Sequence, residues 1–290
     1  RRAMLQHPAR QLVVEAEGST YRKPGALALV ADDGHRVGVI SGGCLEPGLV
    51  KLGLDALAAA HPRVAVFDTR SDDDLVFGSG SGCRGRMRVV ALPVLPEAKS
   101  PVLDALFTAH DARQPARLAL DALAPNLGLP VEVIVRPPPL VLLLGAGPEA
   151  PPLVGIARTL GWYVWLADHR TGLLEEPRLE AVDRVMVARP AAALSSLAGT
   201  HLDAAIAMTH TAEHDLAALA ALAAHVVRYV GLLGPPARRD ELLERLTPAQ
   251  RAALDGRLHA PVGLKLGGEG PEVIALTIAA ELQRAFHRAG

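Results

Sequence analysis

The chain has 290 residues, of which half are apolar and 21% are charged, and its formal net charge is −1. This near-neutral balance excludes a general attraction to nucleic acid or to an acidic membrane surface, and 3% aromatic residues provide no ladder for base stacking. The longest apolar runs, such as 140–144, are far too short to span a membrane, so we expect neither a nucleic-acid nor a membrane partner. Two cysteines and no signal-peptide pattern predict a cytoplasmic protein without disulfides.

The first hundred residues carry short strand-like runs separated by glycine turns, together with one helical repeat of leucines. Asp32-Asp33-Gly34 reads as a hairpin turn between two of the strands. These features predict an α+β domain over residues 1–136. The expected strands are 12–15, 27–30, 37–40, 63–67 and 86–92, and the expected helix is 49–60.

The stretch from about 93 to 139 has a mixed pattern that ends in Pro137-Pro138-Pro139. Three consecutive prolines cannot extend a helix or pair inside a sheet, so we interpret this stretch as a linker.

Residues 140–290 have a different rhythm, in which strands alternate with helices rich in alanine and leucine. The run 140–144 is continuously apolar, as expected of a central parallel strand that is covered on both faces. The alternation predicts a Rossmann-like, doubly wound parallel sheet. The expected strands are 140–144, 163–167, 184–187, 204–208 and 226–230, with a helix ending near 160 after the first.

Both cysteines follow glycine-rich turns. Cys44 comes after Ser41-Gly42-Gly43, and Cys83 comes after Gly82. Glycines allow a backbone to turn tightly and to approach a ligand, although a lone cysteine is also common as a small buried apolar residue. We predict a functional role for at least one of the two thiols.

A dinucleotide fingerprint, Gly145-x-Gly147-x-x-Ala, lies between the first strand and the first helix of the second domain, and Asp168 ends the next strand. In this fingerprint the glycines approach a pyrophosphate and the acidic residue binds a free ribose 2′-hydroxyl. Here three prolines remove N–H donors from the turn and Glu149 adds a negative charge. The sequence is compatible both with NAD binding and with a purely structural role for the turn.

His210 follows the strand 204–208, at the carboxyl edge of the predicted sheet, where ligands bind in such folds. A ligand-binding role and a helix-capping role both fit that place. His201, His214 and His225 lack the paired spacing of a zinc site, and no nucleophile elbow is visible.

Besides these motifs, the chain contains several short segments that together carry a family resemblance. The first half contains 17–26 (EGSTYRKPGA), 38–46 (GVISGGCLE), 68–74 (DTRSDDD) and 80–83 (GSGC), and the second half contains 208–210 (MTH), 229–234 (YVGLLG) and 261–264 (PVGL). This series resembles the XdhC/CoxI family, the accessory factors of xanthine dehydrogenase and related molybdenum hydroxylases. The resemblance covers nearly the whole chain.

The resemblance implies a non-enzymatic maturation factor or chaperone. Such a protein would bind the molybdenum cofactor (molybdopterin), assist its sulfuration with a cysteine desulfurase and insert it into a molybdenum hydroxylase apoenzyme. Cys44 is the expected metal ligand, and Arg22 is the expected partner of the cofactor phosphate. The residues expected at cofactor-binding sites are Arg22, Ser41, Gly42, Gly43, Cys44, Glu46, Gly82, Cys83, Gly145, Gly147, Asp168 and His210.

Two other functions are compatible with the sequence: an NAD(P)-dependent oxidoreductase with a cysteine in its active site, and a nucleotide sensor without chemistry. A homodimer is the expected assembly. We also expect Cys44 and Cys83 to lie close together, unbridged, facing a groove between the two domains near Gly145 and His210.

Overall fold

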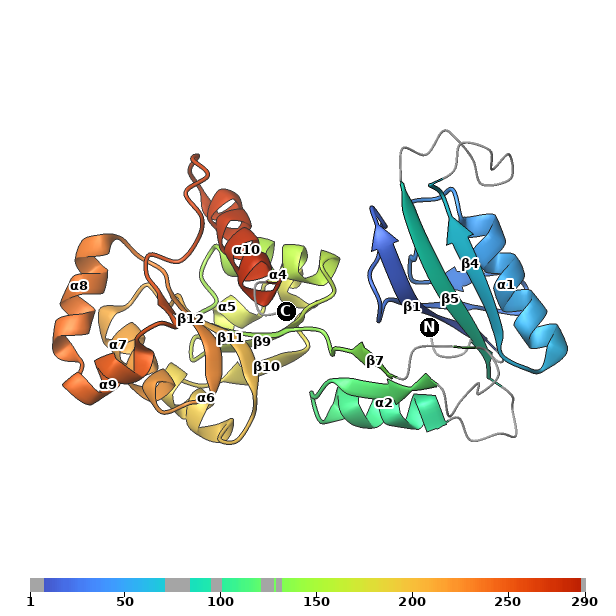
Figure 1. The fold of residues 1–290 in the computed structure, drawn as a ribbon. Helices are drawn as coiled ribbons and strands as arrows, with labels where there is room; N and C mark the ends of the chain where they lie inside the picture. The colour runs from blue at the N-terminus through green and yellow to red at the C-terminus, as the bar shows by residue number, and fades with distance from the viewer. Residues whose placement is uncertain (1–7, 71–83, 95–100, 121–127, 129–131, 288–290) are drawn as a thin grey trace. The chain divides into compact units, whose positions relative to one another are not determined.

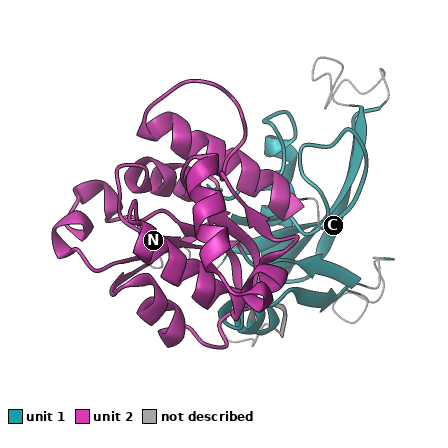
Figure 2. Cartoon of the chain, turned by 90° about the vertical axis from the view of Figure 1, so that its left-hand side faces the viewer, with its two compact units in different colours: residues 1–137 teal, residues 138–290 magenta. Residues whose placement is uncertain are grey.

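The computed structural model of the chain describes residues 8–70, 84–94, 101–120, 128 and 132–287. The chain forms two compact units, unit 1 over residues 1–137 and unit 2 over residues 138–290 (Figure 2). The division falls within the run of three prolines.

Unit 1 is built on a five-stranded antiparallel sheet with the strand order β3-β2-β1-β5-β4. Figure 1 shows β1, β5 and β4 of this sheet side by side. The expected hairpin is present, since Leu29 of one strand pairs with Val37 of the next. The strands are β1 (Ala9–Gly18), β2 (Leu27–Val30), β3 (Arg36–Val37), β4 (Arg63–Asp68) and β5 (Gly85–Pro93).

One face of this sheet is covered by helix α1 (Glu46–Ala59). The helix begins three residues before the predicted start, with Pro47 in its first turn, where the missing N–H costs no helical hydrogen bond. Leu49, Leu52 and Ala56 are buried against the sheet. The helix therefore follows directly from the Ser-Gly-Gly-Cys turn and holds the end of that turn in place.

The other face of the sheet is covered by the stretch that the sequence predicts as a linker. This prediction is wrong for much of its length, because residues 93–139 contain α2 (Pro101–Asp111), β6 (Ala116–Ala119) and β7 (Glu132–Val135). Leu118 and Val133 form a second apolar core with Leu12 and Val90 of the main sheet. The sequence signal was weak because these elements are short and separated by prolines.

The strand predicted over 37–40 is also shorter than expected, since β3 ends at Val37. Gly38 has a φ of +97°, and a Cβ at this position would lie 2.8 Å from the carbonyl oxygen of Leu27. The backbone turns away from the sheet here, and only glycine fits. The turn releases residues 38–45 from the ladder.

Unit 2 contains a six-stranded parallel sheet with the order β10-β9-β8-β11-β12-β13. Numbered from the first strand of the unit, this is 3-2-1-4-5-6, the Rossmann order. The predicted fold class is therefore confirmed, although the two-residue strand β13 was not foreseen. The strands are β8 (Leu140–Leu144), β9 (Tyr163–Asp168), β10 (Arg184–Val187), β11 (Leu202–Ala207), β12 (Val227–Leu232) and β13 (Leu258–His259).

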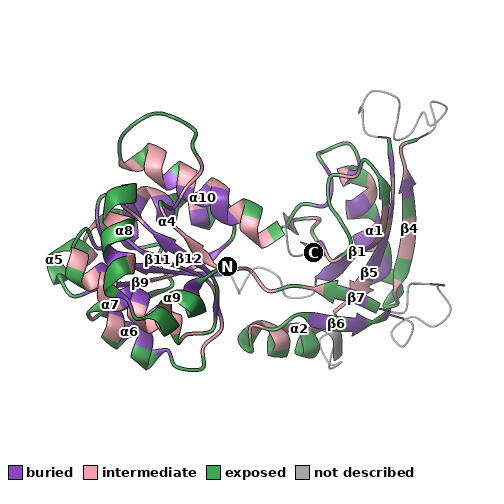
Figure 3. Ribbon diagram, turned by 60° about the vertical axis from the view of Figure 1, so that its left-hand side comes forward, coloured by how far each residue is buried: buried purple, intermediate pink, exposed green. Residues whose placement is uncertain are grey.

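Helices cover both faces of the unit 2 sheet. Alternate residues of β8 enter two separate cores, Leu142 on one side and Leu143 on the other, and all five residues of the strand are buried. Figure 3 draws buried residues in purple, and they gather on the strands between the helices of unit 2. One face packs against α4 and α10, and the other packs against α6, α7, α8 and α9. The helices are α4 (Ala150–Thr159), α5 (Thr171–Leu174), the 3-10 turn η2 (Pro177–Leu179), α6 (Pro190–Ser196), α7 (Ala212–Ala223), α8 (Pro236–Arg245), α9 (Pro248–Leu254) and α10 (Pro271–His287).

The strand order of unit 2 reverses between β8 and β11, which are hydrogen-bonded neighbours. In doubly wound sheets, ligands bind beyond the carboxyl ends of the strands at such a switch point. Among the described helices, none is long and apolar enough to cross a bilayer.

Candidate functional site

The motif segments of unit 1 meet at one end of its sheet, although they are far apart in the sequence. A small cavity of about 30 Å³ is lined by residues from the turn after β1, from the Ser-Gly-Gly-Cys turn, and from the facing ends of β4 and β5. Thr20, Ser41, Cys44 and Thr69 belong to this lining. Thr69 fastens two of the segments, because its Oγ1 donates to the carbonyl of Gly85 at 3.0 Å and accepts the N–H of Gly85 at 3.2 Å. We name this end of unit 1 the cysteine site.

The Ser-Gly-Gly turn is held from below by Glu46, the first residue of α1. Its Oε1 accepts the hydroxyl of Ser41 at 2.7 Å and the N–H of Ser41 at 3.2 Å, and its Oε2 contacts Arg36. The hydroxyl oxygen of Ser41 in turn accepts the N–H of Gly43 at 3.3 Å. Ser41 and Glu46 therefore shape the turn, and the carboxylate of Glu46 is already occupied by protein partners.

Cys44 is exposed and free of any disulfide. Gly43, just before it, has a φ of +125°, and a Cβ at Gly43 would meet no atom of the described residues within 4 Å. The turn thus presents a thiol beside open space, and its backbone conformation favours glycine. An accessible thiol on a glycine turn can act as a soft ligand or as a sulfur nucleophile once it is ionised.

Arg22 is exposed, and its guanidinium has no hydrogen-bond or ion-pair partner among the described residues. Its neighbour Lys23 donates to the hydroxyl of Thr20 at 3.2 Å. A free guanidinium beside the cysteine site is available to an anionic ligand, for which it offers bidentate hydrogen bonds.

The predicted site residues of unit 2 also come together, at the switch point of its sheet. Gly145 follows β8 with a φ of +123°, and a Cβ there would collide with the backbone of Met208, which follows β11. A hollow of about 820 Å³ opens beside this contact. Gly147, Arg170, Arg178 and His210 line it together with residues of α5 and η2.

His210 and Glu149 form a pair at the mouth of the dinucleotide turn. The Nε2 atom of His210 lies 2.8 Å from Oε2 of Glu149, which is buried. His210 has a φ of +62°, the left-handed region that is uncommon for residues other than glycine. Both side chains lie against Gly147, the glycine at which the backbone approaches a pyrophosphate in the dinucleotide fingerprint.

Asp168 was expected to bind a ribose hydroxyl, but its carboxylate is buried and bonded to the protein. Its Oδ2 accepts the N–H of Ala146 at 2.8 Å, and both of its oxygens accept hydrogen bonds from the guanidinium of Arg170. Burial alone would raise the pKa of Asp168, but these hydrogen bonds outweigh it and lower the pKa to about 2. In this structure the carboxylate ties the phosphate turn to Arg170, and the hollow is lined by Arg170 instead.

One buried network at the switch point was missed from the sequence. Asp215 of α7 is fully buried, and its Oδ1 accepts the hydroxyl of Thr209 at 2.7 Å and the N–H of Thr209 at 3.0 Å. Its Oδ2 accepts Arg238 of α8 at 2.5 Å. This network holds the Met208-Thr209-His210 segment in place. The only sequence signal was an acidic residue five positions after His210, which is too common to stand out.

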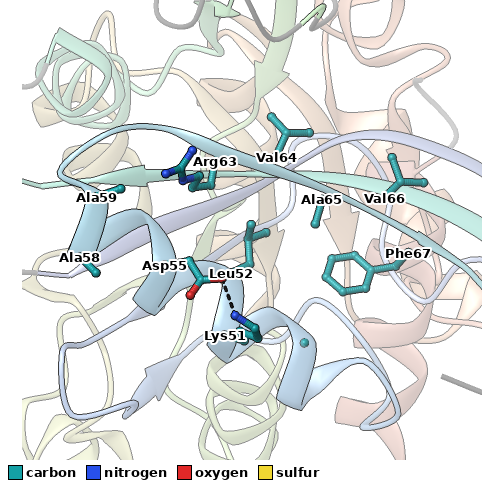
Figure 4. A pocket seen from close by; sticks show the side chains of 11 residues that line it. Lys51, Leu52, Asp55, Ala58, Ala59, Arg63, Val64, Ala65, Val66 and Phe67 are labelled. Carbon is teal, nitrogen blue, oxygen red and sulfur yellow. Dashed lines mark hydrogen bonds and ion pairs between the residues drawn. The ribbon is translucent and has the colours of Figure 1, made fainter. Parts of the chain in front are cut away.

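Unit 1 also has a hollow of about 710 Å³ between α1 and β4, larger than the cavity at the cysteine site. Lys51 and Asp55 of α1 pair at 2.8 Å, and Figure 4 shows them beside Leu52, with Ala65 and Phe67 of β4 pointing toward the helix. None of the predicted site residues lines this hollow. Its walls are apolar apart from this ion pair and Arg63, and they contain no thiol, hydroxyl or imidazole group among the described residues.

Two of the predicted site residues, Gly82 and Cys83, lie outside the described residues, so the predicted approach of Cys83 to Cys44 stays a prediction, as does the groove between the domains. The other ten fall into two groups, one in each unit. In the described part of the chain, no group of three or more histidine, cysteine or acidic side chains could hold a metal ion.

Comparison with known proteins places these features in a family. Sequence models match the chain at residues 141–282 (XdhC Rossmann domain) and 6–68 (XdhC and CoxI family). A Bacillus subtilis (strain 168) protein, described as a probable subunit of xanthine dehydrogenase, is 30% identical over 93% of this chain and 90% of its own length. The uncharacterized protein YqeB of Escherichia coli (strain K12) is 26% identical over 96% of this chain and 43% of its own length. The crystal structure of a xanthine dehydrogenase from Bacillus halodurans matches with a TM-score of 0.82 and 28% identity, over 100% of this chain and 94% of that one.

Proposed function

Because the chain belongs to the XdhC and CoxI family, we propose that it is a maturation factor for a molybdenum hydroxylase of the xanthine dehydrogenase type. In finer terms, we propose that it binds the molybdenum cofactor, presents it for sulfuration by a cysteine desulfurase, and passes it to the hydroxylase apoenzyme. The observation that carries the proposal is the convergence of the family motifs of unit 1 around the exposed thiol of Cys44. A cytoplasmic homodimer, as expected from the sequence, is part of the same proposal.

The residues at the cysteine site fit this cofactor chemically. The cofactor carries a phosphate, a pterin ring and sulfur-bound molybdenum. Arg22 supplies a cation without a partner among the described residues, the turn at Gly43 leaves open space, and Cys44 supplies a thiol. Thiolate sulfur is a soft donor suited to molybdenum or to transferred sulfur.

The chain's own residues would then have separate tasks. Arg22 would pair with the phosphate and fix one end of the ligand. Ser41 and Glu46 would keep the turn in shape through their 2.7 Å hydrogen bond, so that Cys44 stays directed at the ligand. The bound cofactor would supply the metal centre that the hydroxylase needs.

The cysteine count argues against a role as the iron–sulfur subunit of the hydroxylase. The 290 residues contain two cysteines, whereas an iron–sulfur cluster of the common kind needs four thiolates. The names of two relatives refer to xanthine dehydrogenase. These names are consistent with a functional association between this protein and a hydroxylase of that type.

The competing function, a nicotinamide-dependent oxidoreductase, finds less support in unit 2. Glu149 and His210 close one side of the phosphate turn, and Asp168 is bonded to Arg170. Pro148, Pro151 and Pro152 have no N–H to give to a phosphate.

The deciding experiment is purification of the protein from a bacterium that makes the cofactor, followed by metal and pterin analysis. We expect molybdenum and pterin in nearly equal amounts with the wild-type protein, and a loss of molybdenum with Cys44→Ser. A preparation that carries nicotinamide and no pterin would contradict the proposal and favour the oxidoreductase.

A further inference from the structure

Tyr21 offers a flat aromatic surface at the cysteine site. Its side chain lines the same small cavity as Cys44, yet 63% of the residue is exposed. A Cβ at Gly42 would lie 3.6 Å from Cδ2 of the ring and 3.9 Å from Cε2. Part of the ring therefore rests against the glycine turn, and the remainder is open to solvent.

The size of the cavity decides where a ring-shaped ligand could lie. Its volume of about 30 Å³ has room for about two water molecules, far less than a pterin needs. Phe67, which lines the floor, is only 4% exposed and belongs to the core. A flat ligand beside Cys44 must therefore lie on the surface, where Tyr21 is the exposed aromatic residue of the lining.

Two guanidinium groups near Tyr21 have no carboxylate partner among the described residues. Arg84 lies next to the same turn, because its carbonyl oxygen accepts the N–H of Ser19 at 3.3 Å. Its exposed side chain, like that of Arg22, has no partner among the described residues. The described carboxylates nearby are already paired, Glu17 with Arg70 and Arg86, Asp68 with Arg70, and Glu46 with Arg36.

We propose that Tyr21 is the ring-recognition residue of the cysteine site and that Arg84, with Arg22, holds the phosphate of the same ligand. This inference rests on the proposed function, since the cofactor named there combines a flat pterin ring with one phosphate. Aromatic stacking gives affinity to any flat ring, and the two guanidinium groups select rings that carry a phosphate. The site thus reads the pterin phosphate half of the cofactor separately from the metal, which is left to Cys44.

The test uses the full-length protein and the fluorescent pterin phosphate that is obtained by oxidative breakdown of the cofactor. This probe keeps the ring and the phosphate but has neither metal nor dithiolene. Its binding is followed by fluorescence quenching and polarisation. We expect Tyr21→Ala to bind about tenfold more weakly, which corresponds to about 1.4 kcal/mol, within the range of a lost stacking contact. Tyr21→Phe should stay within about twofold of wild type, because the ring is kept.

Arg84→Ala should also weaken binding by about tenfold and flatten its dependence on salt, since one charge contact is lost. The matched controls are Arg63→Ala, at the far end of β4, and Phe107→Ala, an exposed aromatic residue of α2; neither should change the affinity. Unchanged binding by both Tyr21→Ala and Arg84→Ala would overturn the inference, and so would a wild-type protein that does not bind the probe. In either case, molybdenum and pterin found with the purified wild-type protein would show that the proposed function itself survives.

Discussion

The Nε2 atom of His210 lies 2.8 Å from Oε2 of Glu149, and the two side chains close over Gly147. A Cβ at Gly147 would come within 2.8 Å of the same nitrogen and 3.2 Å of the same oxygen. The dinucleotide turn of unit 2 therefore has the backbone of a phosphate-binding loop, but a buried carboxylate of the protein lies where an anion would bind.

We expect NAD to bind the wild-type protein only in the millimolar range or more weakly. Glu149→Gln removes the repelling charge and should tighten NAD binding by about tenfold, still short of micromolar affinity because the three prolines give no N–H donors. Isothermal titration measures both affinities. Glu175→Gln, the same change at an exposed position of the same hollow, is the control and should have little effect. Micromolar NAD binding by the wild-type protein would refute this reading of the turn.

The lowered pKa of Asp168 should make the stability of unit 2 depend on pH. The pKa of Asp168 falls from 3.8 to about 2 in the folded protein, so the ionised carboxylate stabilises unit 2 at pH values above about 4. The corresponding free energy is roughly 2 kcal/mol, and about 1 kcal/mol of it should be lost by pH 3 as the carboxylate begins to be protonated in the unfolded chain.

Urea unfolding, monitored by tryptophan fluorescence, reports on unit 2, because both tryptophans, Trp162 and Trp165, belong to that unit. The difference in unfolding free energy between the wild type and Asp168→Asn should shrink between pH 6 and pH 3. A difference that is independent of pH would show that the carboxylate of Asp168 is not held in its charged form.

The parts of the fold that the sequence predicted well are those with one dominant pattern. The apolar run 140–144 is typical of a strand buried on both faces, and β8 has these bounds. Gly145, Gly147 and His210 were placed at the sheet edge because parallel strands end there, and all three line or adjoin the hollow at the switch point. Local periodicity carries enough information for such elements.

Other parts depended on contacts that are distant in the sequence. Residues 93–139 looked like a linker because α2 and β6 gain their stability from packing against the main sheet of unit 1. The Asp215–Arg238 pair joins α7 to α8 across 23 positions in the sequence, and no short sequence motif predicts it. The buried orientation of the Asp168 carboxylate could not be predicted either, because it depends on the conformation of Arg170, two residues later.

The Asp215–Arg238 pair should be important for the stability of unit 2. Arg238→Met leaves the fully buried carboxylate of Asp215 without its charged partner, and breaking a buried pair in this way typically costs roughly 3 to 5 kcal/mol. Arg245→Met, on the same helix, breaks an exposed pair with Glu213 and should cost less than about 1 kcal/mol. Urea unfolding by tryptophan fluorescence compares the two variants. Equal effects would mean that Asp215 does not depend on Arg238.

The last prediction concerns Cys44. Cys44→Ser keeps the size of the side chain but replaces an ionisable, soft sulfur with a hydroxyl that stays protonated at neutral pH. Because Cys44 is exposed, the variant should unfold within about 0.5 kcal/mol of the wild type. We expect it nevertheless to support activation of the apo-hydroxylase at least tenfold less well, in an assay with purified cofactor and cysteine desulfurase. Cys83→Ser is the matched control, with the same atomic change at the other cysteine: a similar loss there would favour one site that uses both thiols, and normal activation would leave Cys44 as the working thiol. Full activation by a stably folded Cys44→Ser protein would contradict the role of this thiol, and the binding of the cofactor would then rest on Tyr21 and the arginines alone.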